Sequence, residues 1–277
     1  MSHPFYLIDV FESGSFSGNP LAVVVADDVS PEDMLTICRW LNFSETAFLL
    51  TPTDPAADYR VRIFTPEREL PFAGHPTLGT CHAWLSRGGH PKGADIVQEC
   101  GAGLIHIRRD DDRLAFAAPP LIRSGPIGTD DLAEICGVLN IPQDQVAAAE
   151  WADNGPGWAG IRLASAEEVL ALKPAGTHRR QIDIGVMGPY AAGHEVAWEI
   201  RTFFTDHLGV IREDPVTGSF NASAAQALLR DGLATAPYVA AQGTQLGRRG
   251  RIHVSQDGDG RVWIGGRSRI VFEGMAR

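Results

Sequence analysis

The sequence predicts an α+β protein made of two similar domains. Two stretches carry the same order of residue types. Residues 64–85 place the titratable His75 with Gly, Pro and Thr before a mostly apolar helix, and residues 213–229 place Asp214 with Pro, Gly and hydroxyl side chains before a helix of small residues. The hexapeptides 37–42 and 135–140 also match at four positions. Because helix, strands, titratable loop and buried helix recur in that order, we expect an ancient duplication.

In the first half, two strands are expected at 5–11 and 21–26, joined by a turn-rich loop. The segment 30–33, Ser-Pro-Glu-Asp, predicts the start of a helix, since Ser can cap it, Pro fits its first turn and the acidic side chains face its positive end. Glu45 lies where this helix gives way to a strand at 47–50. A further alternating strand, 60–63, enters the His75 loop.

The second half begins at the proline-rich segment 119–126, which we take as the boundary between domains 1–118 and 119–277. Capped helices are expected from Thr129 and from Ser165, and strands at 182–186 and 199–204 precede the Asp214 loop and its helix. Two final strands, 251–254 and 261–271, flank a turn.

Composition argues against several classes of partner. Lys and Arg total 24 against 34 Asp and Glu, and no basic cluster stands out, which disfavours nucleic acid and anionic membrane. No apolar run approaches the roughly 20 residues of a membrane-spanning helix, and the first residues do not resemble a signal peptide, so we expect a cytoplasmic protein. The four cysteines lack zinc spacing, and no phosphate or dinucleotide loop is present. The sequence therefore carries no cofactor signature.

Three titratable residues are candidates for chemistry. Glu45, beside the Ser44 hydroxyl and an apolar strand, could be partly desolvated, which raises a carboxyl pKa toward the range useful for moving protons on carbon; it could equally be a surface or capping residue. His75 is held between Gly74 and a proline, yet histidines at helix starts are also common structural residues. Asp214 could serve a site, a turn or a cap.

The starts of the two buried helices are candidate anion sites. The backbone N–H groups in the first turn of a helix have no partner within it, so the turn that follows Gly74 could receive a carboxylate beside His75. In the second helix Thr217 and Ser219 are expected to be caps, and the N–H groups that follow them, from Gly218 onward, could also bind an anion.

Four segments, taken together, closely resemble the PhzF-like isomerase family of phenazine biosynthesis: 42–48 (NFSETAF), 62–66 (RIFTP), 71–79 (PFAGHPTLG) and 213–219 (EDPVTGS). The resemblance spans almost the whole chain. It implies a fold similar to diaminopimelate epimerase, with two pseudo-symmetric domains, each a curved sheet or open barrel around one central helix. It further implies that the last strand can return to the first domain, that the protein is a homodimer, and that no metal or cofactor is needed.

The resemblance also implies roles for the candidates. Glu45 would act as general acid and base, taking a proton from a ring carbon of a small carboxylate substrate similar to dihydrohydroxyanthranilate and returning it at another carbon. His75 and Asp214 would support proton transfer or hold polar groups of the substrate. Gly74 and Ser219 would bind the substrate through the helix starts, with Ser44, Thr217 and Gly218 beside them.

Two departures from related sequences bear on the reaction. Epimerase relatives use a pair of cysteines, whereas Ala73 and the segment 214–215 supply none, which disfavours racemisation by two thiols. Ser219 is followed by Phe220 and Asn221 where phenazine-type members tend to carry a small residue and then His. Two alternatives stay open: an amino-acid racemase or epimerase that uses Glu45 and Asp214 on opposite faces of its substrate, and a non-catalytic protein that binds a small molecule.

Overall fold

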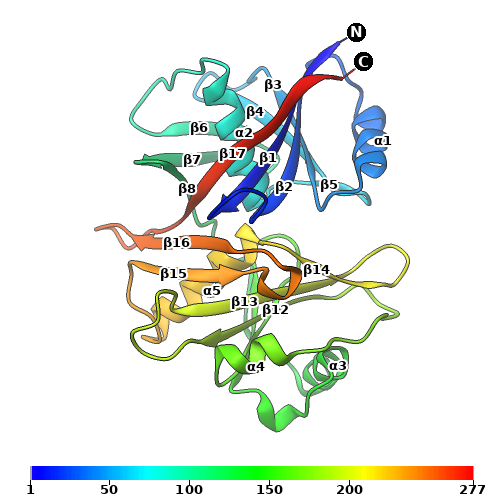
Figure 1. Cartoon of the computed structure of the whole chain (residues 1–277), viewed down its shortest axis with the longest axis vertical. Coiled ribbons are helices and arrows are strands. Elements are labelled where there is room, and N and C mark those ends of the chain that lie inside the picture. Colours follow the sequence, from blue (N-terminus) through cyan, green and yellow to red (C-terminus); the bar gives the residue numbers. More distant parts are fainter. Residues whose placement is uncertain (1, 277) are drawn as a thin grey trace. The chain divides into compact units, whose positions relative to one another are not determined.

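A computed structural model describes residues 2–276 of the chain (Figure 1). It divides into two compact units, one formed by residues 2–117 and 265–276 and the other by residues 118–264. The last residues therefore group with the first unit, and the second unit ends at Ile264 rather than at the C-terminus.

The first unit contains a closed barrel. Its strands are β1 (His3–Glu12), β2 (Asn19–Val25), β3 (Thr46–Leu50), β4 (Tyr59–Phe64), β6 (Ile96–Cys100), β7 (Gly103–Asp110), β8 (Arg113–Ala117) and β17 (Val262–Ala276). Each of these strands pairs with the next one in this order. The pairs β2–β3 and β4–β6 are parallel, and the pairs β1–β2, β3–β4, β6–β7, β7–β8 and β1–β17 are antiparallel. The pairing of β8 with β17, and of β17 with β1, closes the ring. The short β5 (Glu69–Leu70) extends from β4.

The helix α2 (Gly74–Ser86) contacts β1, β2, β3, β4 and β8 and is the central helix of this barrel (Figure 1). Small residues let it approach the strands: a Cβ added at Gly79 would lie 2.5 Å from Leu21 Cδ2. The other helix, α1 (Pro31–Leu41), packs Met34 and Cys38 into a separate apolar cluster. Its predicted cap is confirmed, because the Ser30 side chain accepts a hydrogen bond from the Asp33 N–H.

The second unit repeats this order. Its strands are β9 (Arg123–Pro126), β10 (Ala148–Asp153), β11 (Ala159–Arg162), β12 (Asp183–Pro189), β13 (Trp198–Thr205), β14 (Ile211–Asp214), β15 (Tyr238–Gln242) and β16 (Gly250–Gln256). Its helices are α3 (Thr129–Leu139), α4 (Ala166–Ala171) and α5 (Gly218–Arg230), with short 3₁₀ turns at Gln143–Gln145 and Thr244–Leu246. The pairings β11–β12 and β13–β15 are parallel, matching β2–β3 and β4–β6, and α5 follows β14 as α2 follows β5. The predicted α+β fold with two pseudo-symmetric halves is confirmed.

The matching hexapeptides are not part of this repeat. Residues 37–42 end α1, which lies between the parallel partners β2 and β3, whereas residues 135–140 end α3, which precedes β10. The element equivalent to α1 is α4, between β11 and β12. The two hexapeptides share a helix end instead: Asn42 and Asn140 both adopt the left-handed conformation at the C-cap, with φ of 55° and 61°.

Candidate active site

In the first unit the structure brings Glu45 and His75 together. Glu45 immediately precedes β3, and His75 is the second residue of α2. The distance from His75 Nε2 to Glu45 Oε2 is 3.6 Å, just beyond hydrogen-bond length, and neither atom is accessible to solvent. The His75 side chain is 2% exposed and that of Glu45 is 15% exposed. The pair thus joins a buried imidazole to a carboxylate that still reaches the surface.

Burial lowers the pKa of His75 to about 3. The charged imidazolium would lose its hydration inside the unit, and that loss favours the neutral ring. At neutral pH the contact with Glu45 is therefore between a neutral imidazole and a carboxyl group, and not an ion pair. A neutral imidazole has one N–H donor and one acceptor nitrogen, so its tautomer decides what it offers to Glu45.

Asn19, which the sequence did not single out, lies on the other side of the imidazole. Its Nδ2 is 3.4 Å from His75 Nδ1, and its side chain is fully buried at the start of β2. The preceding turn is held by Asp9, whose carboxylate accepts hydrogen bonds from the N–H groups of Ser17 and Gly18. Asn19 and His75 are 56 residues apart in the chain, so no local pattern could have paired them.

The start of α2 can receive an anion. Its N-cap is Ala73, which makes no side-chain capping hydrogen bond, and the Thr77 N–H is already bonded to the Ala73 carbonyl. The backbone N–H groups of Gly74 and His75 have no partner within the helix. Ser44, half-buried, precedes Glu45 in the loop before β3. A carboxylate is the natural ligand for such a helix start.

In the second unit Asp214 belongs to a buried hydrogen-bond network. It ends β14 and accepts a hydrogen bond from the Thr217 hydroxyl. The Thr217 oxygen is also 2.6 Å from the Thr202 hydroxyl, and Gln242 donates to both of these threonine oxygens. Gln242 further accepts hydrogen bonds from the Thr217 N–H and from Asn221 Nδ2. This glutamine ties β15 to the start of α5.

Ser219 is positioned by two side chains that the sequence did not indicate. Trp158 Nε1 donates to its hydroxyl oxygen at 3.0 Å, and Asn154 Nδ2 donates to its carbonyl at 2.8 Å. Thr217 is the N-cap residue of α5 as predicted, although its side chain makes no capping hydrogen bond, whereas the prediction that Ser219 is a cap is wrong because Ser219 lies inside the helix. Their hydroxyls are instead engaged by Asp214 and Trp158, partners from outside the helix.

The two residues after Ser219 point into the interior of the second unit. Phe220 is fully buried, packs edge-on against Trp158 and occupies space left by Gly185, where an added Cβ would lie 2.1 Å from its ring. Asn221 donates to the Thr217 carbonyl and to Gln242. Both side chains therefore support the second unit's interior.

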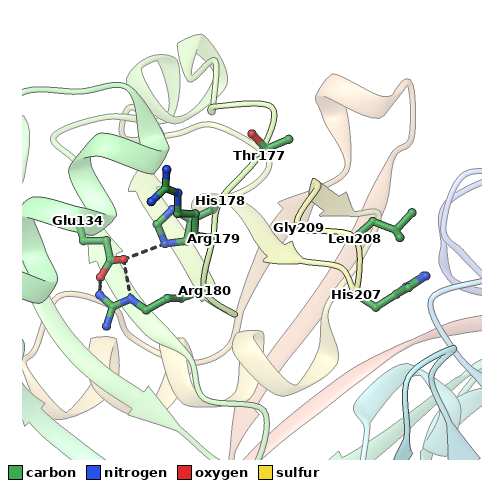
Figure 2. Close-up of a pocket in the computed structure, with 8 residues that line it drawn as sticks. All are labelled: Glu134, Thr177, His178, Arg179, Arg180, His207, Leu208 and Gly209. Carbon is green, nitrogen blue, oxygen red and sulfur yellow. Dashed lines mark hydrogen bonds and ion pairs between the residues drawn. The ribbon is translucent and has the colours of Figure 1, made fainter.

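A broad hollow of about 910 Å³ elsewhere in the second unit contains none of the predicted site residues. It is lined by Glu134, Thr177, His178, Arg179, Arg180, His207, Leu208 and Gly209 (Figure 2). Two arginines line this hollow, and one of them, Arg180, already has an acidic partner, because Glu134 accepts hydrogen bonds from both His178 and Arg180. The predicted site residues lie instead near the start of α2 in the first unit and near the start of α5 in the second, each among buried polar side chains of its own unit.

Residues 2–276 offer neither a metal-binding cluster nor a helix able to span a membrane. No group of three or more His, Cys, Asp or Glu side chains in that range is arranged to hold a metal ion. In the same range no helix combines the length and apolar character needed to cross a membrane.

Comparison with known proteins identifies the family. The family model of phenazine biosynthesis-like proteins, PhzC-PhzF, matches residues 8–274. The chain is 36% identical over 295 residues to Antisense-enhancing sequence 1 of Schizosaccharomyces pombe, covering 99% of this chain and 98% of that protein. It is 34% identical over 264 residues to a trans-2,3-dihydro-3-hydroxyanthranilate isomerase of Pseudomonas fluorescens, covering 92% and 91% of the two chains.

A solved structure agrees with the sequence relatives. The crystal structure of a PhzF-family phenazine biosynthesis protein from Enterococcus faecalis superposes with a TM-score of 0.78 at 26% identity and covers 100% of both chains. Fold, family model and curated relatives point the same way, which confirms the resemblance seen in the four sequence segments. The chain belongs to the phenazine biosynthesis-like (PhzC-PhzF) family and is an isomerase of the PhzF type.

Proposed function

We propose that this protein moves a proton between carbon atoms of a small carboxylate substrate similar to dihydrohydroxyanthranilate, with Glu45 as the acid/base group. The observation that carries the proposal is the pairing of Glu45 with a buried, neutral His75. Relatives from Pseudomonas fluorescens and Pseudomonas aeruginosa, 34% and 32% identical to this chain, are named trans-2,3-dihydro-3-hydroxyanthranilate isomerases.

In the proposed reaction Glu45 begins as a carboxylate and removes a proton from carbon. The electron pair left behind shifts through the adjacent double bond, and the protonated Glu45 returns its proton to a different carbon. The substrate gains and loses one proton, so the reaction is balanced and needs no oxidant, reductant or organic cofactor. A carboxyl group that is 15% exposed can hold the proton between the two steps and can also exchange it with solvent.

The helix starts are proposed to bind the polar groups of the substrate. In the first unit the N–H groups of Gly74 and His75, with the hydroxyl of Ser44, the residue before Glu45, would hold a carboxylate. In the second unit the start of α5 offers the Gly218 and Ser219 N–H groups, and Thr217 holds Asp214 as an acceptor for a substrate O–H or N–H.

The test is proton NMR in deuterated water with dihydrohydroxyanthranilate, a panel of other small carboxylates and common amino acids. The wild type should exchange a carbon-bound proton of its substrate for deuterium, and Glu45→Gln should reduce the exchange rate by about 10²–10⁴-fold. Glu32→Gln, on the exposed surface of α1, is the matched control and should retain the wild-type rate.

The product distinguishes the possible reactions. A shifted double bond supports the isomerase, while inversion of a stereocentre without a shift would identify a racemase. Full exchange in folded Glu45→Gln would refute the role of Glu45, and ligand binding without any exchange across the panel would indicate a binding protein.

A further inference from the structure

We propose that Asn19 is a positioning residue that fixes His75 as the Nε2–H tautomer, so that the imidazole presents its proton to Glu45. The consequence for the reaction rests on the proposed function above, while the tautomer itself can be tested without it. The inference follows from the Asn19 contact at Nδ1 and the Glu45 contact at Nε2.

The two ring nitrogens of His75 face groups of different chemistry. The Asn19 Nδ2 group can only donate, so the nitrogen it faces must be the acceptor. A neutral imidazole carries one N–H, which then lies on Nε2, 3.6 Å from Glu45 Oε2. Burial keeps this ring neutral at ordinary pH, so the choice between tautomers is a real one.

The Asn19 amide could face His75 Nδ1 with either its nitrogen or its oxygen. Turning the amide over would place its oxygen against Nδ1 and require the proton there. With Glu45 in the carboxylate form from which the proposed reaction starts, the Nε2 lone pair would then face a carboxylate oxygen across 3.6 Å in a region closed to solvent, and two electron-rich atoms repel each other in such surroundings. The orientation with Nδ2 toward His75 avoids this repulsion.

The turn that carries Asn19 is held in place by its own contacts. Asp9 is almost fully buried, and it fixes the two residues before Asn19 by accepting the Ser17 and Gly18 N–H groups at 2.9 and 2.8 Å. The turn is also packed tightly, because a Cβ at Gly18 would lie 2.0 Å from the Val10 carbonyl oxygen. Asn19 therefore keeps its place without depending on a bound ligand.

The second unit uses an equivalent arrangement. The turn between β10 and β11 corresponds to the turn between β1 and β2, and Asp153 holds it by accepting the N–H groups of Gly155 and Gly157. Trp158, at the end of this turn, donates its indole N–H to Ser219, the second residue of α5, as Asn19 donates to the second residue of α2. An indole N–H can only donate, which leaves the Ser219 hydroxyl hydrogen available to a different acceptor.

For the reaction, the assigned tautomer stabilises Glu45 in its carboxylate form. An N–H on Nε2, 3.6 Å from Oε2, favours the charged carboxylate over the neutral acid, whereas a lone pair there would favour the acid. Glu45 would then be ready to accept a proton from carbon when the substrate arrives. Asn19 reaches the reacting atoms only through His75.

The experiment is a two-bond ¹H–¹⁵N correlation spectrum of the ¹⁵N-labelled full chain at pH 7.5, with the His75 signals assigned by their loss in His75→Gln. The wild type should show Nε2 as the protonated nitrogen. Asn19→Asp, nearly identical in shape, replaces the donor with an acceptor and should move the proton to Nδ1, which inverts the pattern. The matched control is Gln98→Glu, the same amide-to-acid change at a buried residue that bonds Thr77 of α2, and its His75 pattern should stay as in the wild type.

Protonated Nδ1 in the wild type would overturn the proposal without any variant, as would an unchanged His75 pattern in folded Asn19→Asp. If that variant does not fold, Asn19→Ala provides the second measurement: loss of the donor leaves only Glu45 to favour Nε2–H, so the Nδ1–H tautomer should gain population relative to the wild type, and a tautomer pattern unchanged from the wild type would overturn the proposal. The tautomer is read without substrate, so a failure of the proposed function would appear only as absent carbon-proton exchange.

Discussion

Acid should destabilise this protein through His75, and the size of the effect follows from its burial. The pKa of His75 is about 3 in the folded chain against an ordinary value of 6.5. Between these two values the unfolded chain binds a proton that the folded chain refuses, so stability is lost as pH falls from 6.5 toward 3. At pH 5 the 1.5-unit distance below 6.5 corresponds to about 2 kcal/mol, relative to pH 8.

The assay is urea unfolding of the wild type and of His75→Gln at pH 8 and pH 5. The variant lacks the titrating ring, so its loss of free energy of unfolding on acidification should be smaller than that of the wild type by about 2 kcal/mol. His90→Gln, at an exposed position shortly after α2, is the control and should lose as much as the wild type. Equal losses in the wild type and His75→Gln would refute the argument that burial holds the imidazole neutral.

Three further predictions concern stability. Gln242→Ala should lower the free energy of unfolding, measured in urea, by about 3 kcal/mol or more, because it removes the hydrogen-bond partner of buried groups on Thr202, Thr217 and Asn221. Gln98→Ala is the comparison and should cost less, because Gln98 bonds the side chains of Tyr59 and Thr77. Gly185→Ala should cost about 1–3 kcal/mol in the same assay because its Cβ would overlap the Phe220 ring, while Gly176→Ala, with open space around its Cβ, should change stability by less than about 0.5 kcal/mol. Burial raises the pKa of Glu199, so the folded chain holds a proton that the unfolded chain releases, and stability is lost as pH rises through the folded pKa. The free energy of unfolding of Glu199→Gln should therefore rise relative to that of the wild type between pH 5 and pH 8. A difference between the two proteins that does not depend on pH would contradict this.

The sequence indicated those parts of the fold whose signals are local. The cap at Ser30, the two central helices and some strands rich in β-branched residues, such as β2 and β4, were visible in short windows. Several strands were not, among them β10, β11 and β15, which are short and rich in Ala or Gly. Such segments have weak strand propensity, and their conformation is set by pairing with distant strands.

In the candidate site, too, the sequence predicted only the residues that a local motif marks. Glu45 and His75 were predicted from motifs, and Asp214 from the echo of one loop in another. Asn19, Trp158 and Gln242 were missed because their partners lie 56, 61 and 25 residues away, and an isolated Asn, Trp or Gln carries no chemical signature. Once the fold is known the symmetry between the units makes Asn19 and Trp158 a recognisable pair.

Burial explains why these missed residues matter. An imidazole removed from water stays neutral, and each of its ring nitrogens then needs a polar neighbour, because a buried polar atom without one costs about 1–3 kcal/mol. Glu45 can face only one of the two nitrogens, and Asn19 faces the other. The same burial that removes the charge of His75 thus makes its tautomer a property of the surrounding fold, decided by a turn that Asp9 holds in place. Proton transfer at Glu45 would depend on that turn through His75.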